Sequence, residues 1–401
     1  MRLLGEKLWE AARSARDARR QRLSRLSAAI HANPEEGWAE VKAARWLGEC
    51  LAQEGFRVTA PAGGVETAFR AEWSRGKGGP TIAYLAEYDA LPELGHACGH
   101  NLIGAAAAGA GAALRQVMLD GGLEGEVLVL GTPAEEVGGG KLKLLEAGMF
   151  DGLDAVLMMH PATSTRVGGT SLALTPIRFA FQGKAAHAAA SPHEGINALD
   201  AVIQTFNNAN ALRQHVTEDV RLHGIITRGG VAPNIVPDAA EAYFYVRASS
   251  IGVVSSTLAR LENCARAAAL ATGASLTIHI EDSYLEILPN APLEGCLLQS
   301  LSQAGVAVEP TPDIGMRGST DFGNVSHACP SAAFTMAIAP REVAVHSPEF
   351  AAASASLAGE AAMHEAVLVL AAAGLILIGD PALVAAAHAA GKEHRAGPAL
   401  E

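Results

Sequence analysis

Four short apolar segments, separated by helix-like stretches, constrain the fold of this chain most strongly. Their composition is that of buried β-strands, and the regions around them, such as 2–30 and 39–55, show the apolar period of helices. Strands that alternate with helices predict an α/β fold in which helices cover both faces of a mixed, largely parallel sheet. The four segments are residues 81–92, 125–136, 154–161 and 331–349.

Acidic residues and histidines end or follow these segments. Because ligands of open α/β sheets gather at the carboxyl ends of the strands, we expect these side chains to converge at one edge of the sheet. Between the first two segments, HACGHN (96–101) leads into an Ala/Gly-rich stretch (104–114), which predicts a helix packed closely on the sheet. In chain order the polar residues are Glu87, Asp89, Glu135, Glu136, His160 and, in the last loop, His346.

The middle of the chain has a different pattern. From about residue 170 to 282 the expected order is strand, helix, strand, strand, helix, strand. Two helices on one face of a small, mainly antiparallel sheet form a stable α+β pair of layers. We therefore expect an inserted domain at residues 173–286, which divides the main domain into residues 1–172 and 287–401.

Several side chains expected at the sheet edge are good ligands for a transition metal. Cys98 and His100, two residues apart, present a thiolate and an imidazole from one loop. Together with Glu136, His160 and His346 they form a donor set that suits Zn²⁺ or Mn²⁺ better than Ca²⁺ or Mg²⁺. Five ligands exceed the need of one tetrahedral ion, which indicates two ions that share a bridging group.

Each of these residues has an ordinary structural explanation when it is taken alone. A histidine after a strand is often a hydrogen-bonded loop residue, a single cysteine is commonly part of the core, and adjacent acids are usually solvated. Their joint position after apolar strands favours the metal site, because burying unpaired charge there is unfavourable. Glu135 and Glu136 are adjacent, so one can bind metal while the other transfers a proton, and spacing leaves that assignment open.

Six motifs follow one another along the chain: AEYDALPELGHACGHNLIG, GTPAEEVGGGK, GKAAHAAASPHEGINALDA, GGVAPNIVPD, RGSTDFGNVSH and HSPEF. They resemble the aminoacylase/carboxypeptidase metallopeptidase family. More narrowly, they are similar to its amidohydrolase branch, which includes auxin-conjugate hydrolases and aminobenzoyl-glutamate hydrolases. The resemblance covers about residues 25–375, and it includes the opening motif HANPEEGWAE at 31–40.

The resemblance implies a role for each matching residue. Glu135 would be the general base and acid, and Asp89 would orient a histidine ligand. Glu87 stands where many relatives have a metal-binding histidine, and we assign it no role; Asn101 stands where the motif commonly has Asp. The expected cofactors are two divalent ions, Mn²⁺ or Zn²⁺, with Co²⁺ or Ni²⁺ as alternatives. Their ligands would be Cys98 as the bridging group, His100, Glu136, His160 and His346.

The inserted domain resembles the lid of that family, through which many members dimerise. His187 and Asn234 match lid residues that polarise the scissile carbonyl, and Arg247 matches one that holds the substrate carboxylate. Without the resemblance we would regard Arg247 as a surface charge and Asn234 as a turn residue. The resemblance therefore implies catalytic and substrate-binding roles for these residues and a homodimer formed through the lid.

Taken together, these features predict a metal-dependent amidohydrolase or peptidase. It would hydrolyse the linear amide bond of an N-acyl amino acid or a small dipeptide-like substrate through a metal-activated water. Two alternatives stay open: an inactive member that acts as a binding or scaffold protein, and a thiol-dependent hydrolase that uses Cys98. The chain has no GxSxG elbow and no Walker loop.

Composition limits the expected partners and location. Of 401 residues, 49% are hydrophobic and 18% are charged, which excludes a disordered chain. The 30 Lys and Arg against 42 Asp and Glu give a net charge of −12, so we expect no nucleic acid partner. No uninterrupted apolar run reaches the ~18 residues of a membrane span, so we expect no membrane partner. Five scattered cysteines and the lack of a signal peptide predict a cytoplasmic protein, with a transit peptide as the alternative for the Arg-rich start.

Overall fold

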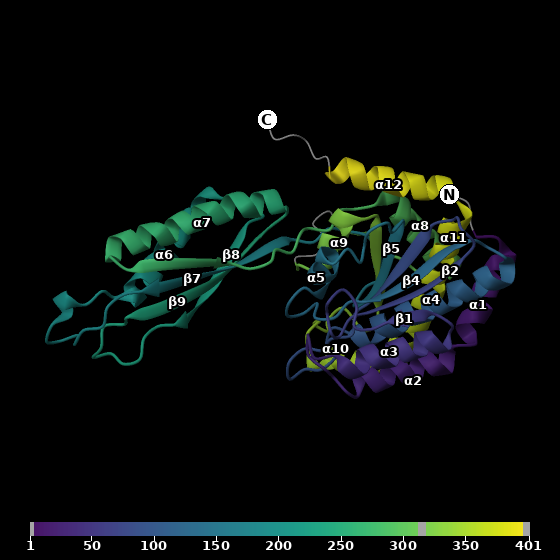
Figure 1. Cartoon of the computed structure of the whole chain (residues 1–401), viewed down its shortest axis with the longest axis horizontal. Coiled ribbons are helices and arrows are strands. Elements are labelled where there is room, and N and C mark those ends of the chain that lie inside the picture. The colour runs from purple at the N-terminus through teal and green to yellow at the C-terminus, as the bar shows by residue number, and fades with distance from the viewer. Residues whose placement is uncertain (1–3, 312–317, 396–401) are drawn as a thin grey trace. The chain divides into compact units, whose positions relative to one another are not determined.

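The computed structural model describes residues 4–311 and 318–395. The chain forms two compact units, one of which is interrupted in sequence by the other (Figure 1). The described part of the first unit lies within residues 4–170, 287–311 and 324–395, and that of the second within 171–286 and 318–323. Whether each unit folds as an independent domain, as the boundaries expected from the sequence imply, stays a prediction.

Within the described residues, the first unit is built on a seven-stranded sheet. Strands β4, β3, β5 and β11 are neighbours and parallel, while β1, β2 and β6 are antiparallel additions at the two edges. The predicted mixed, largely parallel α/β sheet is confirmed. In sheet order the strands are β1 (Arg57–Thr59), β2 (Phe69–Arg75), β4 (Gly125–Gly131), β3 (Thr81–Ala86), β5 (Ala155–Ala162), β11 (Ser331–Ala337) and β6 (Arg166–Val167).

Helices flank this sheet, and α4 (His100–Gly121) packs directly on its central strands. Its small residues permit this packing: a Cβ at Gly111 would lie 2.5 Å from Val129 of β4, and one at Gly109 would lie 2.5 Å from Leu23. The predicted close approach of the Ala/Gly-rich helix is therefore confirmed. The other helices of this part are α1 (Glu6–Asp17), α2 (Arg20–His31), α3 (Val41–Gln53), α5 (Gly140–Glu146), α8 (Ala291–Gln303), α9 (Phe322–Ala328), α10 (Pro348–Ser354), α11 (Leu357–Gly379) and α12 (Pro381–Arg395).

Two helices, α4 and α11, have the length and composition of membrane-spanning segments. In each, 83% of the most apolar window is buried inside the protein, and the two helices pack against each other. Both are accounted for as core helices, since a buried helix is apolar on all sides.

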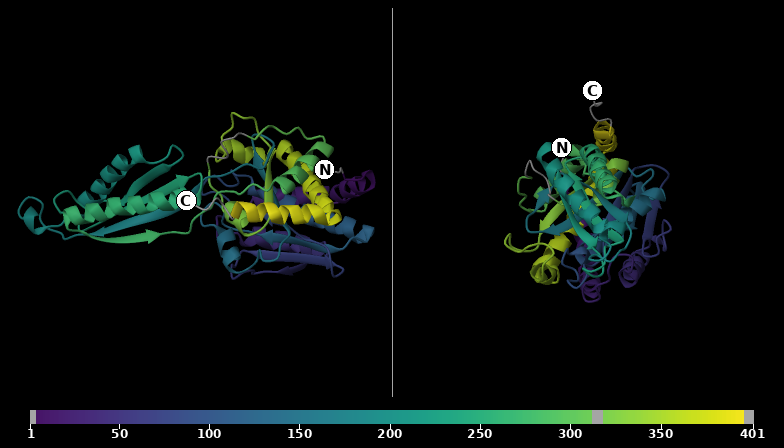
Figure 2. Two further views of the ribbon diagram at one scale, coloured as in Figure 1. Left: turned by 90° about the horizontal axis from the view of Figure 1, so that it is seen from above. Right: turned by 90° about the vertical axis from the view of Figure 1, so that its left-hand side faces the viewer.

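The second unit is an α+β layer pair. Its antiparallel sheet has the order β10 (Ser275–Ile280), β7 (Ala173–Gln182), β9 (Ala239–Ala248), β8 (Arg221–Arg228). Helices α6 (Ala198–Leu212) and α7 (Ile251–Thr272) lie side by side along one face of the sheet (Figures 1 and 2). Burial alternates along β7 and β9, so that Phe179 and Phe244 face the helices while their neighbours face away.

Candidate metal centre

The polar residues predicted at the carboxyl ends of the parallel strands meet in the first unit. Glu87 and Asp89 follow β3, Glu135 and Glu136 follow β4, His160 lies near the end of β5, and His346 lies in the loop after β11. Within the described residues, three groups have ligand atoms that all lie within 4.8 Å of one another. The groups are Cys98, His100 and His160; Cys98, Glu136 and His346; and His100, Glu135 and Glu136.

Hydrogen bonds orient the imidazole rings of His100 and His160. His100 Nδ1 lies 2.9 Å from Asp89 Oδ1, and His160 Nδ1 lies 2.7 Å from the Pro161 carbonyl oxygen. If both Nδ1 atoms donate, both Nε2 atoms are left as lone-pair donors that face the other candidate ligands. Burial alone would raise the pKa of Asp89, but its contact with His100 outweighs burial and lowers that pKa.

Backbone conformation places Cys98 and His346 in the same region. Gly99 begins α4 with a φ of 80°, and a Cβ at this position would lie 2.8 Å from Pro161 Cγ. Only glycine combines that conformation with so close an approach. His346 also has a positive φ, of 64°, and its N–H donates to the Ala97 carbonyl oxygen.

The donor set fits transition-metal ions. Two ligands of one tetrahedral ion, each about 2.1 Å from it, are separated by roughly 3.4 Å. The distances Cys98 Sγ to His160 Nε2 and His346 Nε2 to Glu136 Oε1 are both 3.5 Å. Within the described residues, the buried atoms His100 Nε2 and Glu136 Oε1 make no well-formed hydrogen bond, and their polar neighbours Glu87 Oε2 and His346 Nε2 lie 3.5 Å away. Buried polar atoms without partners are unfavourable, so these atoms fit a cation better than an apolar core.

Burial raises the pKa of the Cys98 thiol, despite the neighbouring His100. A free thiol here therefore stays protonated at neutral pH and is a poor nucleophile. This environment disfavours the thiol-dependent alternative, because a reactive cysteine requires a lowered pKa.

A buried ion pair lies beside the site, and sequence reasoning missed it. Glu87 Oε1 lies 2.7 Å from Lys141 Nζ, and both side chains are almost completely buried. The other oxygen, Oε2, lies 3.5 Å from His100 Nε2. Lysines are rarely buried without a partner. The three glycines of GGGKLK predict that this lysine lies in a solvated loop, so the sequence does not indicate its burial. The one available signal was Glu87 itself, an acid directly after an apolar strand.

Asn101 has a structural role. Its amide nitrogen donates to Ser27 Oγ and to the Ser354 carbonyl oxygen, so it connects α4 with α2 and α10. A carboxylate could not donate these bonds. The groups around position 101 therefore suit Asn better than the Asp that the motif commonly has there.

In the second unit, His187 and Asn234 lie on neighbouring segments. The N–H of Ala188 donates to the Asn234 carbonyl oxygen, and His187 forms a β-bridge with Ile235. His187 Nδ1 accepts hydrogen bonds from the N–H groups of Ala189 and Ala190. Its Nε2 therefore carries the proton in the neutral ring and is a hydrogen-bond donor.

Arg247 lies elsewhere in the second unit. Asn234 precedes β9, whereas Arg247 is near the end of that strand, the eighth residue after Ala239. At about 3.4 Å per residue the two strand ends are roughly 27 Å apart. The structure thus brings His187 and Asn234 together, and it does not bring Arg247 to them. The described residues provide no carboxylate for Arg247, whose guanidinium lies 5.7 Å from the Tyr245 ring centre.

Soft and borderline ligands beside two adjacent carboxylates, at the carboxyl edge of a largely parallel sheet, define a metallohydrolase of α/β fold. The sequence profile of Peptidase family M20/M25/M40 matches residues 83–372, and the chain belongs to this family. It is therefore a hydrolase that acts on amide bonds, which confirms the predicted family and enzyme class.

Relatives agree with this assignment. The chain is 42% identical over 329 residues to Xaa-Arg dipeptidase of Mus musculus, an alignment that covers 78% of this chain and 76% of the relative. It is 37% identical over 308 residues to one of the subunits of p-aminobenzoyl-glutamate hydrolase of Escherichia coli, an alignment that covers 72% of this chain and 64% of the relative.

Solved structures share the fold. An aminohydrolase from Staphylococcus aureus superposes with a TM-score of 0.72 at 20% identity, covering 90% of this chain and 98% of its own. A dinuclear metal-binding peptidase of family M20 from Bacillus subtilis superposes with a TM-score of 0.65 at 21% identity, covering 88% and 98%. Both comparisons confirm the predicted α/β architecture with an inserted domain.

Proposed function

We propose that this chain is a dinuclear metal amidohydrolase with Glu135 as general base and acid. The observation that supports this most is the meeting of one thiol, three imidazoles and two carboxylates from four strand ends, with ligand atoms within 4.8 Å in each group. Cys98, His100 and Glu136 each belong to two of the groups, and in this proposal Cys98 is the bridging ligand, as a thiolate can contact two ions. The metal ligands in this proposal are Cys98, His100, Glu136, His160 and His346.

The side chains divide the chemistry among them. When bound, the ions polarise the substrate carbonyl and acidify the attacking water. Glu135 then accepts a proton from that water and returns it to the departing nitrogen. Asp89 holds the His100 ring so that Nε2 faces the site, because it accepts the bond from Nδ1. Mn²⁺ or Zn²⁺ suits this mixed sulfur, nitrogen and oxygen set.

The lid residues suggest the substrate class. In this proposal His187 Nε2 and the Asn234 amide donate to the carbonyl oxygen as it gains charge, and Arg247 pairs with a free carboxylate. The substrate is then an N-acyl amino acid or a small dipeptide-like molecule. The names of the relatives, Xaa-Arg dipeptidase and p-aminobenzoyl-glutamate hydrolase, fit this class.

The proposal includes a homodimer formed through the second unit. Strand β8 is an edge of its sheet, and it exposes Ile225 and Ile226, 62% and 44% accessible. Such an edge can pair with the same strand of a second copy. A second copy also offers a way to bring an Arg247 and a His187 to one substrate, which the separation within one chain opposes. Sedimentation of the wild type and of the Ile225→Lys variant tests this. The wild type should be a dimer and the variant a monomer, and a monomeric wild type would contradict the proposal.

Metal content and hydrolysis together test the proposed function. Protein purified without chelator should contain close to two equivalents of Mn, Zn or a similar ion, and should release amine from a panel of N-acyl amino acids and dipeptides. Replacing the substrate carboxylate by an amide should lower this activity. Negligible metal that added Mn²⁺ or Zn²⁺ cannot raise, or hydrolysis that survives chelation, would contradict the proposal. A cytoplasmic location, which suits the five free cysteines, stays part of it.

A further inference from the structure

A buried carboxylate outside the candidate ligand set contacts the loop that bears Glu135 and Glu136. Glu40 comes directly before α3 and has no exposed surface. Its Oε1 accepts a hydrogen bond of 2.7 Å from the backbone N–H of Ala134. Glu40 closes the motif HANPEEGWAE, which contributes no residue to the candidate ligand set.

A second buried carboxylate binds the same loop two residues later. Asp89 Oδ2 accepts a 2.9 Å hydrogen bond from the backbone N–H of Glu136, while Oδ1 of the same side chain contacts His100. The backbone is thus anchored to a carboxylate immediately before Glu135 and immediately after it. Fixing both flanking N–H groups limits how far the Glu135 backbone can move away from His100.

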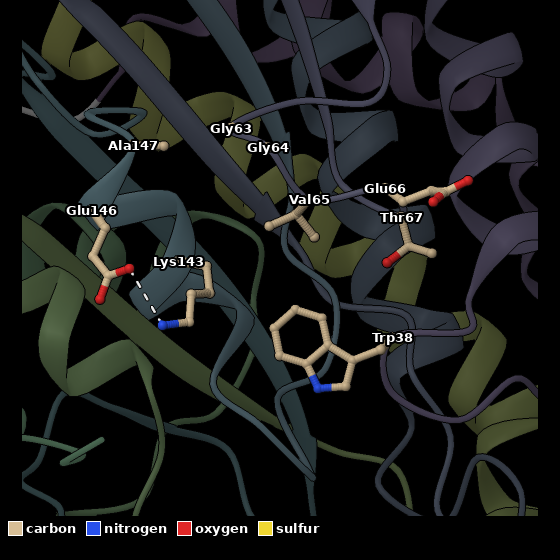
Figure 3. A pocket seen from close by; sticks show the side chains of 9 residues that line it. All are labelled: Trp38, Gly63, Gly64, Val65, Glu66, Thr67, Lys143, Glu146 and Ala147. Carbon is tan, nitrogen blue, oxygen red and sulfur yellow. Dashed lines mark hydrogen bonds and ion pairs between the residues drawn. The ribbon is translucent and has the colours of Figure 1, made fainter. Parts of the chain in front are cut away.

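Shape complementarity also holds residues 36–40 against residues 134–138. A Cβ at Gly37 would overlap the Val137 side chain, and a Cβ at Gly138 would overlap the Trp38 indole. The Trp38 indole also borders a cavity of about 640 Å³ (Figure 3).

Both segments contain a residue in a conformation that is unfavourable for its type. Trp38 has a φ of 71° and Ala134 has a φ of 57°, which is uncommon for residues other than glycine. Such conformations persist only where the surrounding contacts determine them. The bond from Ala134 N–H to Glu40 is one such contact. Removing the acceptor should therefore let the Ala134 backbone relax.

We propose that Glu40 is a positioning residue, which fixes the backbone of residues 133–138 so that the carboxylates of Glu135 and Glu136 face His100. It acts together with Asp89 through the two anchored N–H groups. The roles of Glu135 and Glu136 rest on the proposed function, whereas the fixing of the loop does not. An apolar side chain at position 40 could not accept the bond, so the Ala134 N–H would lose its partner.

The test compares Glu40→Ala with Glu40→Gln, because glutamine keeps an oxygen that can accept from Ala134. Glu35→Ala is the matched control: Glu35 is on the same segment and accepts from the N–H groups of Lys42 and Ala43 at the start of α3, away from the loop. Three quantities are measured: amide hydrogen exchange of the peptide covering residues 133–138, Mn²⁺ affinity by titration of the metal-free chain, and kcat and KM on a substrate that the wild type hydrolyses.

We expect Glu40→Ala to increase exchange of this peptide at least tenfold and to weaken binding of one Mn²⁺ equivalent roughly 10- to 100-fold, as for other residues that support metal ligands. Its kcat should fall more than its KM rises. Glu40→Gln should return exchange, Mn²⁺ affinity and kcat most of the way to the wild-type values. Glu35→Ala should change neither the exchange of residues 133–138 nor the Mn²⁺ affinity of the protein.

Wild-type exchange and Mn²⁺ affinity in a folded Glu40→Ala variant would overturn the proposal. So would a Glu40→Gln variant as impaired as Glu40→Ala, because the acceptor would then be irrelevant. Should Glu40→Ala not fold, Glu40→Leu takes its place, because leucine is closer to glutamate in size and cannot accept the bond from Ala134: unchanged exchange of residues 133–138 in that variant would also overturn the proposal. A wild type without hydrolase activity refutes the proposed function, while faster exchange in Glu40→Ala still supports the positioning role.

Discussion

The two units use sheets of different topology, and this decides which of their polar residues converge. In the first unit the central strands are parallel, so the loops after β3, β4, β5 and β11 all lie at one edge of the sheet. In the second unit β7 and β9 are antiparallel neighbours, so the segment after β7, which bears His187, and the segment before β9, which bears Asn234, lie at one end of the sheet. Arg247 lies near the other end of β9. Residues distant in sequence therefore meet in the first unit, while Asn234 and Arg247 are separated by a strand length in the second.

The two sets of residues also differ in their surroundings. In the first unit, Asp89, Glu87 and His100 are buried, so each charge requires a specific partner. In the second unit, His187 and Asn234 are exposed, and Arg247 is only partly covered. Substitutions in the first unit should therefore change stability and metal binding, whereas those in the second should change substrate affinity with little change in stability.

The largest effect is expected for Glu135→Gln, which removes the proton acceptor and keeps the size of the side chain. Turnover should fall roughly 100- to 10,000-fold, the usual contribution of a general base, because glutamine cannot accept the proton. Metal content should stay at the wild-type value, measured by elemental mass spectrometry on the same sample. Glu124→Gln, an exposed acid just before β4, is the control. Near-normal turnover in Glu135→Gln would show that another group is the base.

A smaller but still large effect is expected for Lys141→Met. Removing the ammonium leaves the buried Glu87 carboxylate without its 2.7 Å partner, which should reduce the free energy of unfolding by about 3–5 kcal/mol. The double variant Lys141→Met/Glu87→Gln should recover part of this loss, because no buried charge is then uncompensated. Urea denaturation measures both variants. Lys143→Met, which removes a partly exposed lysine on the same helix, should change stability by less than about 0.5 kcal/mol.

An equal loss in the single and the double variant would argue against the ion pair as the cause. It would mean that the volume of the Lys141 side chain matters and that its charge does not. The larger effect on stability of substitutions in the buried site than in the exposed second-unit residues would then come from packing and not from charge.

The site was predictable where burial and strand position coincide in the sequence. His160 and Glu136 could be placed because each ends an apolar segment of a parallel sheet, and such ends share one edge. Cys98 and His100 could be placed because the loop HACGHN lies between two such segments. The fold of the first unit was predictable for the same reason, since alternating strands and helices admit few arrangements.

Lys141 and Glu40 could not be predicted, because their burial depends on tertiary packing. Lys141 follows three glycines, and Glu40 begins a helix where acids are ordinarily solvated. Only when residues 36–40 pack on residues 134–138 does Glu40 lose its water. The sequence around either segment does not predict that contact. The separation of Arg247 from Asn234 follows instead from the length of the strand between them.

The smallest effect compares one carboxylate from each unit through the pH dependence of stability. Burial raises the pKa of Glu40 from 4.5 to about 7, so the folded chain keeps a proton that the unfolded chain releases. The bound proton adds up to about 3 kcal/mol to the free energy of unfolding. This stabilisation is fully present below about pH 4.5 and is lost as the pH rises through 7. In the second unit, hydrogen bonds from Ser249 lower the pKa of Asp219 from 3.8 to about 2. Its contribution is present above pH 3.8 and is lost as pH falls through 2.

The variants Glu40→Gln and Asp219→Asn should therefore respond to pH in opposite directions. Relative to wild type, Glu40→Gln should gain stability between about pH 5 and about pH 8, because it has no proton to lose. Asp219→Asn should be the less stable protein above about pH 4, by well under 1 kcal/mol, since solvent screens that exposed group. Urea midpoints at each pH measure both differences. If the stability difference between wild type and Glu40→Gln does not change with pH, the Glu40 carboxylate is hydrated. The contrast between buried carboxylates in the first unit and solvated ones in the second would then not include Glu40.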